Sequence, residues 1–177
     1  MADPASESSL APRAVTLDLE PGRFRFSVWR NISVTMWTGQ ATIEAGRRIL
    51  KLSQQLTREL PGGRSQVLIV RAGTLPPDDA TTELLKDVFD PRLSRIVCIA
   101  AVLEGEGFWA SGIRSRMTKM RIAAGNAMAI RTQETVEEVA TWLPEEHANR
   151  TGVKVSADEL KAMLVASRAL ETLAGTS

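Results

Sequence analysis

The stretch Ile96–Met120 comes nearest to a ligand-binding motif in this chain. It reads IVCIAAVLEGEGFWASGIRSRMTKM, an apolar run followed by a Gly-x-Gly turn and an Arg-rich segment. A phosphate site needs free backbone N–H groups at a helix N-terminus, and a turn at Gly105 and Gly107 would provide them. Phe108 and Arg114 follow, so one hypothesis is that this turn holds a small apolar or anionic ligand.

Two features of the same stretch argue against a phosphate loop. Glu104 and Glu106 place negative charge beside the turn, and this charge would repel a phosphate. Position 110 is alanine, so the dinucleotide fingerprint is incomplete, and the Gly-Lys-Ser/Thr of a P-loop is missing. The sequence therefore favours a tight strand-to-helix turn. A basic groove beside the following helix would need charge from Arg47, Arg48 and Arg131.

Residues for nucleophilic or metal chemistry are few. His147 is the single histidine and lies in the polar segment LPEEHANR, which predicts a solvated or helix-end side chain rather than a catalytic one. Cys98 is the single cysteine and lies in the apolar run RIVCIAAVL, which excludes a disulfide or a cysteine cluster within one chain. Without a His/Cys cluster no metal site is expected. The expectation is a non-enzymatic protein without a cofactor or a metal.

Charge and hydropathy limit the partners. The 177 residues hold 22 Lys+Arg and 21 Asp+Glu, a formal net charge of +1. This balance does not favour nucleic acid or an anionic membrane surface as the partner. No apolar run approaches the ~20 residues that span a bilayer. The first residues lack the basic start and apolar run of a signal peptide, so a cytoplasmic location is expected.

The N-terminal part predicts strands and then a helix. Residues 1–13 are rich in Ala, Pro and Ser and are expected to be a disordered leader. Segments 15–19 and 24–30 alternate apolar and polar residues around a Pro-Gly turn, which predicts two antiparallel strands, and 32–37 is a short third strand. Apolar residues then recur at helical spacing up to the PGG at 61–63.

After residue 63 strand-like and helix-like segments alternate. The apolar runs at 66–70 and 95–103 predict buried strands, 127–132 predicts a short one, and helical patterns separate them. Thr132 is the expected cap of the next helix, and Pro144 is expected to end or kink it. The prediction is one α/β domain over 14–147 with a mixed four- to five-stranded sheet and crossover helices mainly on one face.

A further amphipathic helix is predicted beyond this domain. Residues 148–155 are expected to be a linker and 156–177 a C-terminal helix, with Ser156 and Glu159 as its capping box. Two arrangements remain open for its apolar stripe. The helix packs back on its own domain, or it pairs with another subunit and forms a homodimer.

The order of these elements resembles the STAS-like superfamily, and within it the SpoIIAA-like group. AIRTQETVEEVATWL is the best local match, and IVCIAAVLEGEGFWASGIRS fits the penultimate strand and helix. The resemblance covers roughly residues 14–143. It implies a small α/β domain with a four- or five-stranded sheet and typically no catalysis.

The resemblance also implies two kinds of site. Anti-sigma-factor antagonists of this superfamily carry a phosphorylatable Ser/Thr in an Asp-Ser-Ser-Gly motif, and Asp79, Thr81 and Thr82 stand at the matching place without that motif. A phospho-switch or partner surface there is a hypothesis, beside the simpler interpretation of a solvated first turn. Other members are linked with apolar ligands. Here such a ligand would need a cavity beneath the helices, lined by Phe108, Met117, Met120 and Trp142.

The expected function is therefore a regulatory or protein-interaction domain with an unidentified protein partner. Its contact surface is expected at the helix that starts near Asp78, with the Gly105–Phe108 turn beside it. The alternative is a binder of a small apolar or anionic ligand at Gly105, Gly107, Phe108 and Arg114.

Overall fold

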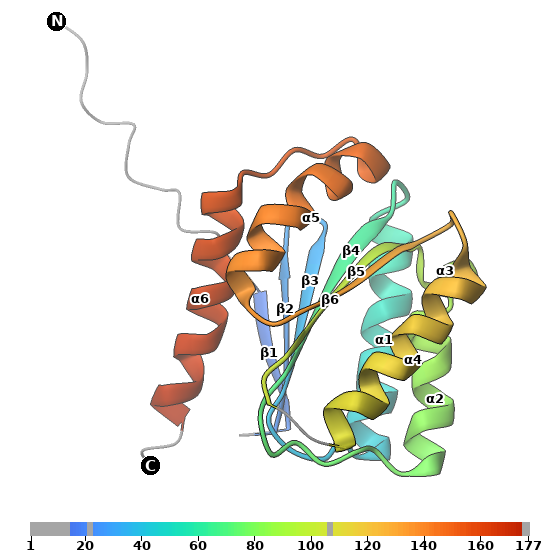
Figure 1. Cartoon of the computed structure of the whole chain (residues 1–177), viewed down its shortest axis with the longest axis vertical. Helices are drawn as coiled ribbons and strands as arrows, with labels where there is room; N and C mark the ends of the chain where they lie inside the picture. The colour runs from blue at the N-terminus through green and yellow to red at the C-terminus, as the bar shows by residue number, and fades with distance from the viewer. Residues whose placement is uncertain (1–14, 21–22, 106–107, 175–177) are drawn as a thin grey trace, which may run out of the picture.

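The structure is a computed structural model that describes residues 15–20, 23–105 and 108–174 (Figure 1). Six strands occur in these ranges: β1 (Val15–Glu20), β2 (Phe24–Trp29), β3 (Ile32–Trp37), β4 (Arg64–Val70), β5 (Ile96–Leu103) and β6 (Ala129–Gln133). The helices are α1 (Ile43–Glu59), α2 (Asp79–Phe89), α3 (Pro91–Ser94), α4 (Phe108–Ala124), α5 (Val136–Thr151) and α6 (Ala157–Ala174). The leader predicted at 1–13 lies outside the described residues.

The strands form one mixed sheet in the order β1-β2-β3-β4-β5-β6. β1, β2 and β3 pair antiparallel, whereas β3, β4, β5 and β6 pair parallel. Parallel neighbours need crossover connections, and right-handed crossovers that advance in one direction place their helices on one face. The predicted α/β class, mixed sheet and crossover helices are confirmed. Within the described residues the sheet has one strand more than the resemblance implies.

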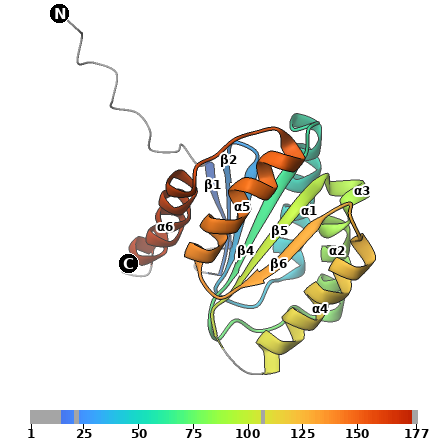
Figure 2. The ribbon, with the colours of Figure 1, turned by 45° about the horizontal axis from the view of Figure 1, so that its top comes forward.

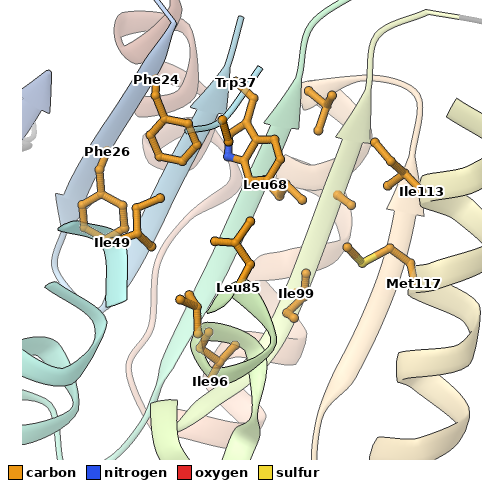
Figure 3. Packing of buried hydrophobic residues seen from close by; sticks show 14 of the residues in the cluster. Phe24, Phe26, Trp37, Ile49, Leu68, Leu85, Ile96, Ile99, Ile113 and Met117 are labelled. Carbon is orange, nitrogen blue, oxygen red and sulfur yellow. The ribbon is translucent and has the colours of Figure 1, made fainter. Parts of the chain in front are cut away.

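The crossover helices cover one face of the sheet, where Phe24, Trp37, Leu68 and Ile99 are buried (Figure 3). The rings of Phe24 and Trp37 lie 5.3 Å apart between centroids. Against these side chains pack the apolar stripes of α1, α2 and α4, and Figure 1 shows all three on the same side of the sheet. The helical and strand periodicities read from the sequence therefore identify this core correctly.

The opposite face is covered by α5 and α6 (Figure 1). Leu160, Met163 and Leu164 of α6 are almost completely buried there. The predicted capping box forms, since Ser156 N–H donates to Glu159 Oε2 at 2.9 Å and Glu159 N–H donates to Ser156 Oγ at 3.1 Å. Of the two arrangements that the sequence leaves open, the described structure has α6 packed on its own domain.

The boundaries of α5 differ from those predicted. Its cap is Thr135, whose Oγ1 accepts the Glu138 N–H at 3.2 Å, because Thr132 belongs to β6. The helix does not end at Pro144 but continues to Gly152, the left-handed residue that closes it. Packing on the sheet both before and after Pro144 outweighs the one helical hydrogen bond that the proline removes. The expected linker at 148–155 is thus shortened from its N-terminal side.

Candidate functional site

The first turn of α2 does not present the predicted residues equally. Asp78 is the N-cap, and its carboxylate accepts the Thr81 N–H at 2.7 Å, a bond that lowers the pKa of Asp78. Asp79 is exposed and Thr82 is partly exposed. The Thr81 side chain is fully buried because α1 approaches closely at Gly46, where an added Cβ would lie 3.6 Å from Thr81 Cγ2. The expectation of a solvated first turn is therefore wrong for Thr81.

Substitution of each of these two threonines by glutamate tests which of the two side chains is buried. Thr81→Glu is expected to lower the free energy of unfolding by about 3 kcal/mol or more, because it buries an unpaired carboxylate. Thr82→Glu is the matched control and should change it by no more than about 0.5 kcal/mol, since position 82 is partly exposed and an acid in a first helical turn is favourable. Urea denaturation of both variants measures this difference. Equal effects would contradict the burial of Thr81.

The Gly105 turn is a junction between loops rather than an open cradle. Gly105 has φ +130° and lies against Ala72, where an added Cβ would approach the Ala72 Cα to 3.3 Å. Glu104, expected to repel a phosphate, forms ion pairs with Arg71 (Nε to Oε2, 2.6 Å) and with Arg168 of α6. Three parts of the chain therefore meet at this carboxylate.

The remaining residues of that predicted ligand turn give it little definition. Gly107 and the Phe108 side chain lie outside the described residues, and Arg114 is half-buried on α4. Among the described side chains, Met117, Met120 and Trp142 do not line one common cavity. Met117 and Met120 belong to the core on the crossover-helix face, whereas Trp142 packs on the opposite face, so the sheet separates them.

A buried polar cluster replaces the solvated histidine that the sequence predicts. His147 of α5 is fully buried between the helix and the sheet. Its Nε2 lies 2.8 Å from Asn31 Oδ1, and its Nδ1 lies 2.6 Å from Ser65 Oγ. The Asn31 amide nitrogen donates to Gly63 O, so its oxygen faces the histidine and accepts a hydrogen bond. Nε2 therefore carries the proton of the neutral ring, and Nδ1 accepts the Ser65 hydroxyl.

This cluster is built for stability rather than for reaction with a substrate. Burial lowers the pKa of His147 to about 4 and raises the pKa of the neighbouring Cys98 thiol to about 11. Ser65 and Cys98 are fully buried as well. Although the residue types resemble a nucleophilic arrangement, a substrate needs access to the nucleophile, and the folded chain closes this one.

The structure brings together another set of residues, at the end of the sheet. α5 packs mainly over β5 and only partly covers β6, so an open cleft of about 400 Å³ remains between α5 and the edge strand. Figure 2 shows β6 as the outermost strand, with α5 and α4 on opposite faces. The cleft is lined by Arg131, Thr132, Gln133, Glu137, Glu138, Thr141 and Trp142.

An arginine–tryptophan pair and an unpaired acceptor characterise this cleft. The Arg131 guanidinium lies 5.8 Å from the centroid of the Trp142 ring, within cation–π range. Gln133 is only 6% exposed, and its Nε2 donates to Glu138 O at 2.7 Å. The Gln133 Oε1 atom is buried and has no hydrogen-bond partner within the described structure. We call this cleft, which lies beside β6 and is lined by Arg131, Gln133, Glu138 and Trp142 among others, the edge cleft.

The sequence contains only partial signals for the edge cleft. Trp142 stands one position off the apolar stripe of its helix, which indicates partial exposure, and Arg131 is a candidate only for a basic groove. The basic groove does not form around α4, because the Arg131 guanidinium lies over Trp142 on the other face of the sheet. The position of β6 at the edge depends on strand order, which the residue pattern does not contain.

Comparison of the chain with family models, with curated proteins and with solved structures finds no match. The STAS-like resemblance therefore stays a prediction from element order and short motifs. Across residues 15–20, 23–105 and 108–174, no group of three or more His, Cys, Asp or Glu side chains is placed to hold a metal ion. No helix in these ranges is long and apolar enough to cross a membrane.

Proposed function

We propose that the chain is a non-enzymatic, STAS-like regulatory domain that acts through protein–protein contacts, with the edge cleft as its contact surface. The observation that carries this proposal is the position of the Arg131 guanidinium over the partly buried Trp142, beside β6 at the edge of the described sheet. Trp and Arg are the residues most enriched at the energetic centres of protein interfaces. An edge strand also offers unpaired backbone donors and acceptors to a partner.

The shape of the edge cleft favours a protein over a small ligand. Small-molecule sites usually enclose most of the ligand surface, whereas this cleft is open to solvent along β6. The buried Ser65–His147–Asn31 cluster is already satisfied internally and offers no group to a ligand. The exposed Asp79 and the partly exposed Thr82 are a second candidate contact, away from the cleft at the start of α2.

A homodimer through α6 is not part of this proposal. The stripe of Leu160, Met163 and Leu164 that would form such an interface is buried against the sheet of the same chain. A partner would have to displace α6 to reach it, and this would expose the core on that face.

Affinity capture with matched variants tests the proposed contact surface. The tagged full chain, an Arg131→Glu/Trp142→Ser variant and an Ile122→Ser control are each incubated with native lysate, and retained proteins are quantified by mass spectrometry. Ile122 is 75% exposed on α4, so its substitution removes a surface apolar group outside the edge cleft.

The expected result is a protein retained in stoichiometric amount by the native chain and the control, and lost from the double variant. Retention of no protein, or equal retention by all three, would overturn the proposal. A small molecule that co-purifies in place of a protein would support the ligand-binding alternative instead.

A further inference from the structure

We propose that the edge cleft binds an extended peptide segment of a partner protein, which adds to the sheet as a strand beside β6. This inference rests on the proposed function and names the kind of partner segment and the chemistry that recognises it. In this binding mode main-chain hydrogen bonds provide affinity, and pockets for alternate side chains provide specificity. The edge cleft supplies both elements, an open edge and a lined pocket next to it.

The edge of β6 is short, five residues with Arg131 at the centre, but two other usual protections against strand addition are absent from this strand. Among the described strands β6 pairs with β5 alone, and its register is regular from Ala129 to Gln133. It contains no proline, and its pairing with β5 shows no bulge. α4 and α5 contact β6 from opposite faces of the sheet. The Arg131 guanidinium lies over Trp142 on one face, so the charge does not block the edge.

A second copy of this chain fits the edge less well than a foreign segment. Arg131 is the central residue of the five in β6. In-register antiparallel pairing of two β6 strands about a two-fold axis would place Arg131 opposite the same residue of the second copy. Like charges directly opposite each other destabilise a strand pair. The occupant is therefore a partner segment whose charges complement the edge cleft.

The lining of the cleft defines which side chains the segment should carry. Alternate residues of an added strand face the α5 side, in register with Arg131 and Gln133. An acidic side chain is expected opposite Arg131, where it would complete an ion pair above Trp142. A donor (Lys, Arg, Asn or Gln) is expected two residues away, beside the exposed Glu138 carboxylate.

The accessible acceptor at the donor position is the Glu138 carboxylate, because the Gln133 Oε1 atom is shielded from solvent. The residue between the acidic and the donor position faces the α4 side, beside Ile130 and Thr132, and is expected to be β-branched. The predicted recognition pattern is thus an acid, a β-branched residue and a donor, in an order set by the direction of the strand.

A phage library of short random peptides, selected on the immobilised full chain, tests this pattern. Enriched peptides are synthesised with a fluorescent label, and binding is measured by anisotropy. Arg131→Glu is expected to weaken binding by about tenfold or more, and a peptide with Lys in place of the acid should recover it. Arg121→Glu, an exposed charge reversal on α4, is the matched control and should leave binding unchanged. N-methylation of the peptide backbone should abolish binding by removing main-chain donors.

Three results would overturn the inference: no enriched sequence, binding that is insensitive to Arg131→Glu, or binding that survives N-methylation. If lysate capture through the edge cleft succeeds while this selection fails, the protein-interaction function stands and strand addition is wrong. If both fail, the proposed function fails with it.

Discussion

Lowering the pH from 6.5 to about 4 is expected to remove about 3 kcal/mol from the free energy of unfolding through His147 alone. The ring has a pKa of about 4 in the folded chain and 6.5 in the unfolded one. Above pH 6.5 it is neutral in both states and contributes no pH dependence. Between these values the unfolded chain binds the proton more strongly, so stability falls as the pH falls.

The environment of the ring explains why it resists protonation. Its direct partners, Asn31 and Ser65, are neutral, and a proton on Nδ1 would lose the hydroxyl donor and leave a buried charge. The charged groups nearby are Glu146 and Arg150 of the same helix, which pair with each other at 2.7 Å. No carboxylate directly contacts His147 within the described structure to compensate a buried imidazolium.

Urea denaturation between pH 7 and pH 5 measures the first part of this loss, about 2 kcal/mol, with little interference from acids. The carboxyls of Asp78, Asp90 and Glu159 have pKa values below their ordinary range, so their stabilisation is lost only at lower pH. A His147→Gln variant is the control. It should be less stable at pH 7 but lose little further stability down to pH 5. The same pH slope in both proteins would refute the assignment to His147.

Leu164→Ala is expected to lower the free energy of unfolding by about 3 kcal/mol. Leu164 of α6 is completely buried in the core between α6 and the sheet, so truncation leaves a cavity there. Val165→Ala is the control on the neighbouring position, which is 48% exposed, and should cost no more than about 0.5 kcal/mol.

Urea denaturation at several protein concentrations distinguishes packing of α6 on its own domain from packing of α6 on a second chain. If α6 packs on its own domain, the denaturation midpoint of the native chain does not change with protein concentration. A midpoint that rises with concentration would show that α6 stabilises an oligomer instead. A Leu164→Ala variant as stable as the Val165→Ala control would show that α6 is not docked at all.

Local patterns were sufficient for much of the fold. Alternation around Phe24 and Phe26 predicted the strand and its buried face, and both residues are in the core. The stripe through Ala45, Ile49 and Leu56 predicted the buried face of α1. Ser156 followed by Glu159 predicted the start of α6. These signals succeed because periodicity and capping depend on residues within a few positions of each other.

Predictions failed where contacts between segments far apart in the sequence determine whether a side chain is buried. Thr81 looked like a solvated residue, but the missing side chain at Gly46 allows α1 to cover it. His147 stands in a polar segment, yet packing of α5 on the sheet buries it. The same packing carries the helix through Pro144, so the prediction that the helix ends there is wrong.

The sequence by itself determined the α/β class, the crossover helices and the existence of an extra C-terminal helix, because each follows from short-range periodicity. Only the tertiary structure decided that α6 closes its own domain, that Asn31, Ser65 and His147 meet in one buried cluster, and that β6 is an edge strand. These features join segments up to 142 residues apart, as in the hydrogen bond that Arg25 Nη1 donates to Ser167 O. Their formation depends on strand order and on which face each helix covers, and no local pattern contains either property. The edge cleft belongs to this second group, since Arg131 and Trp142 pair only because α5 returns across the sheet beside β6.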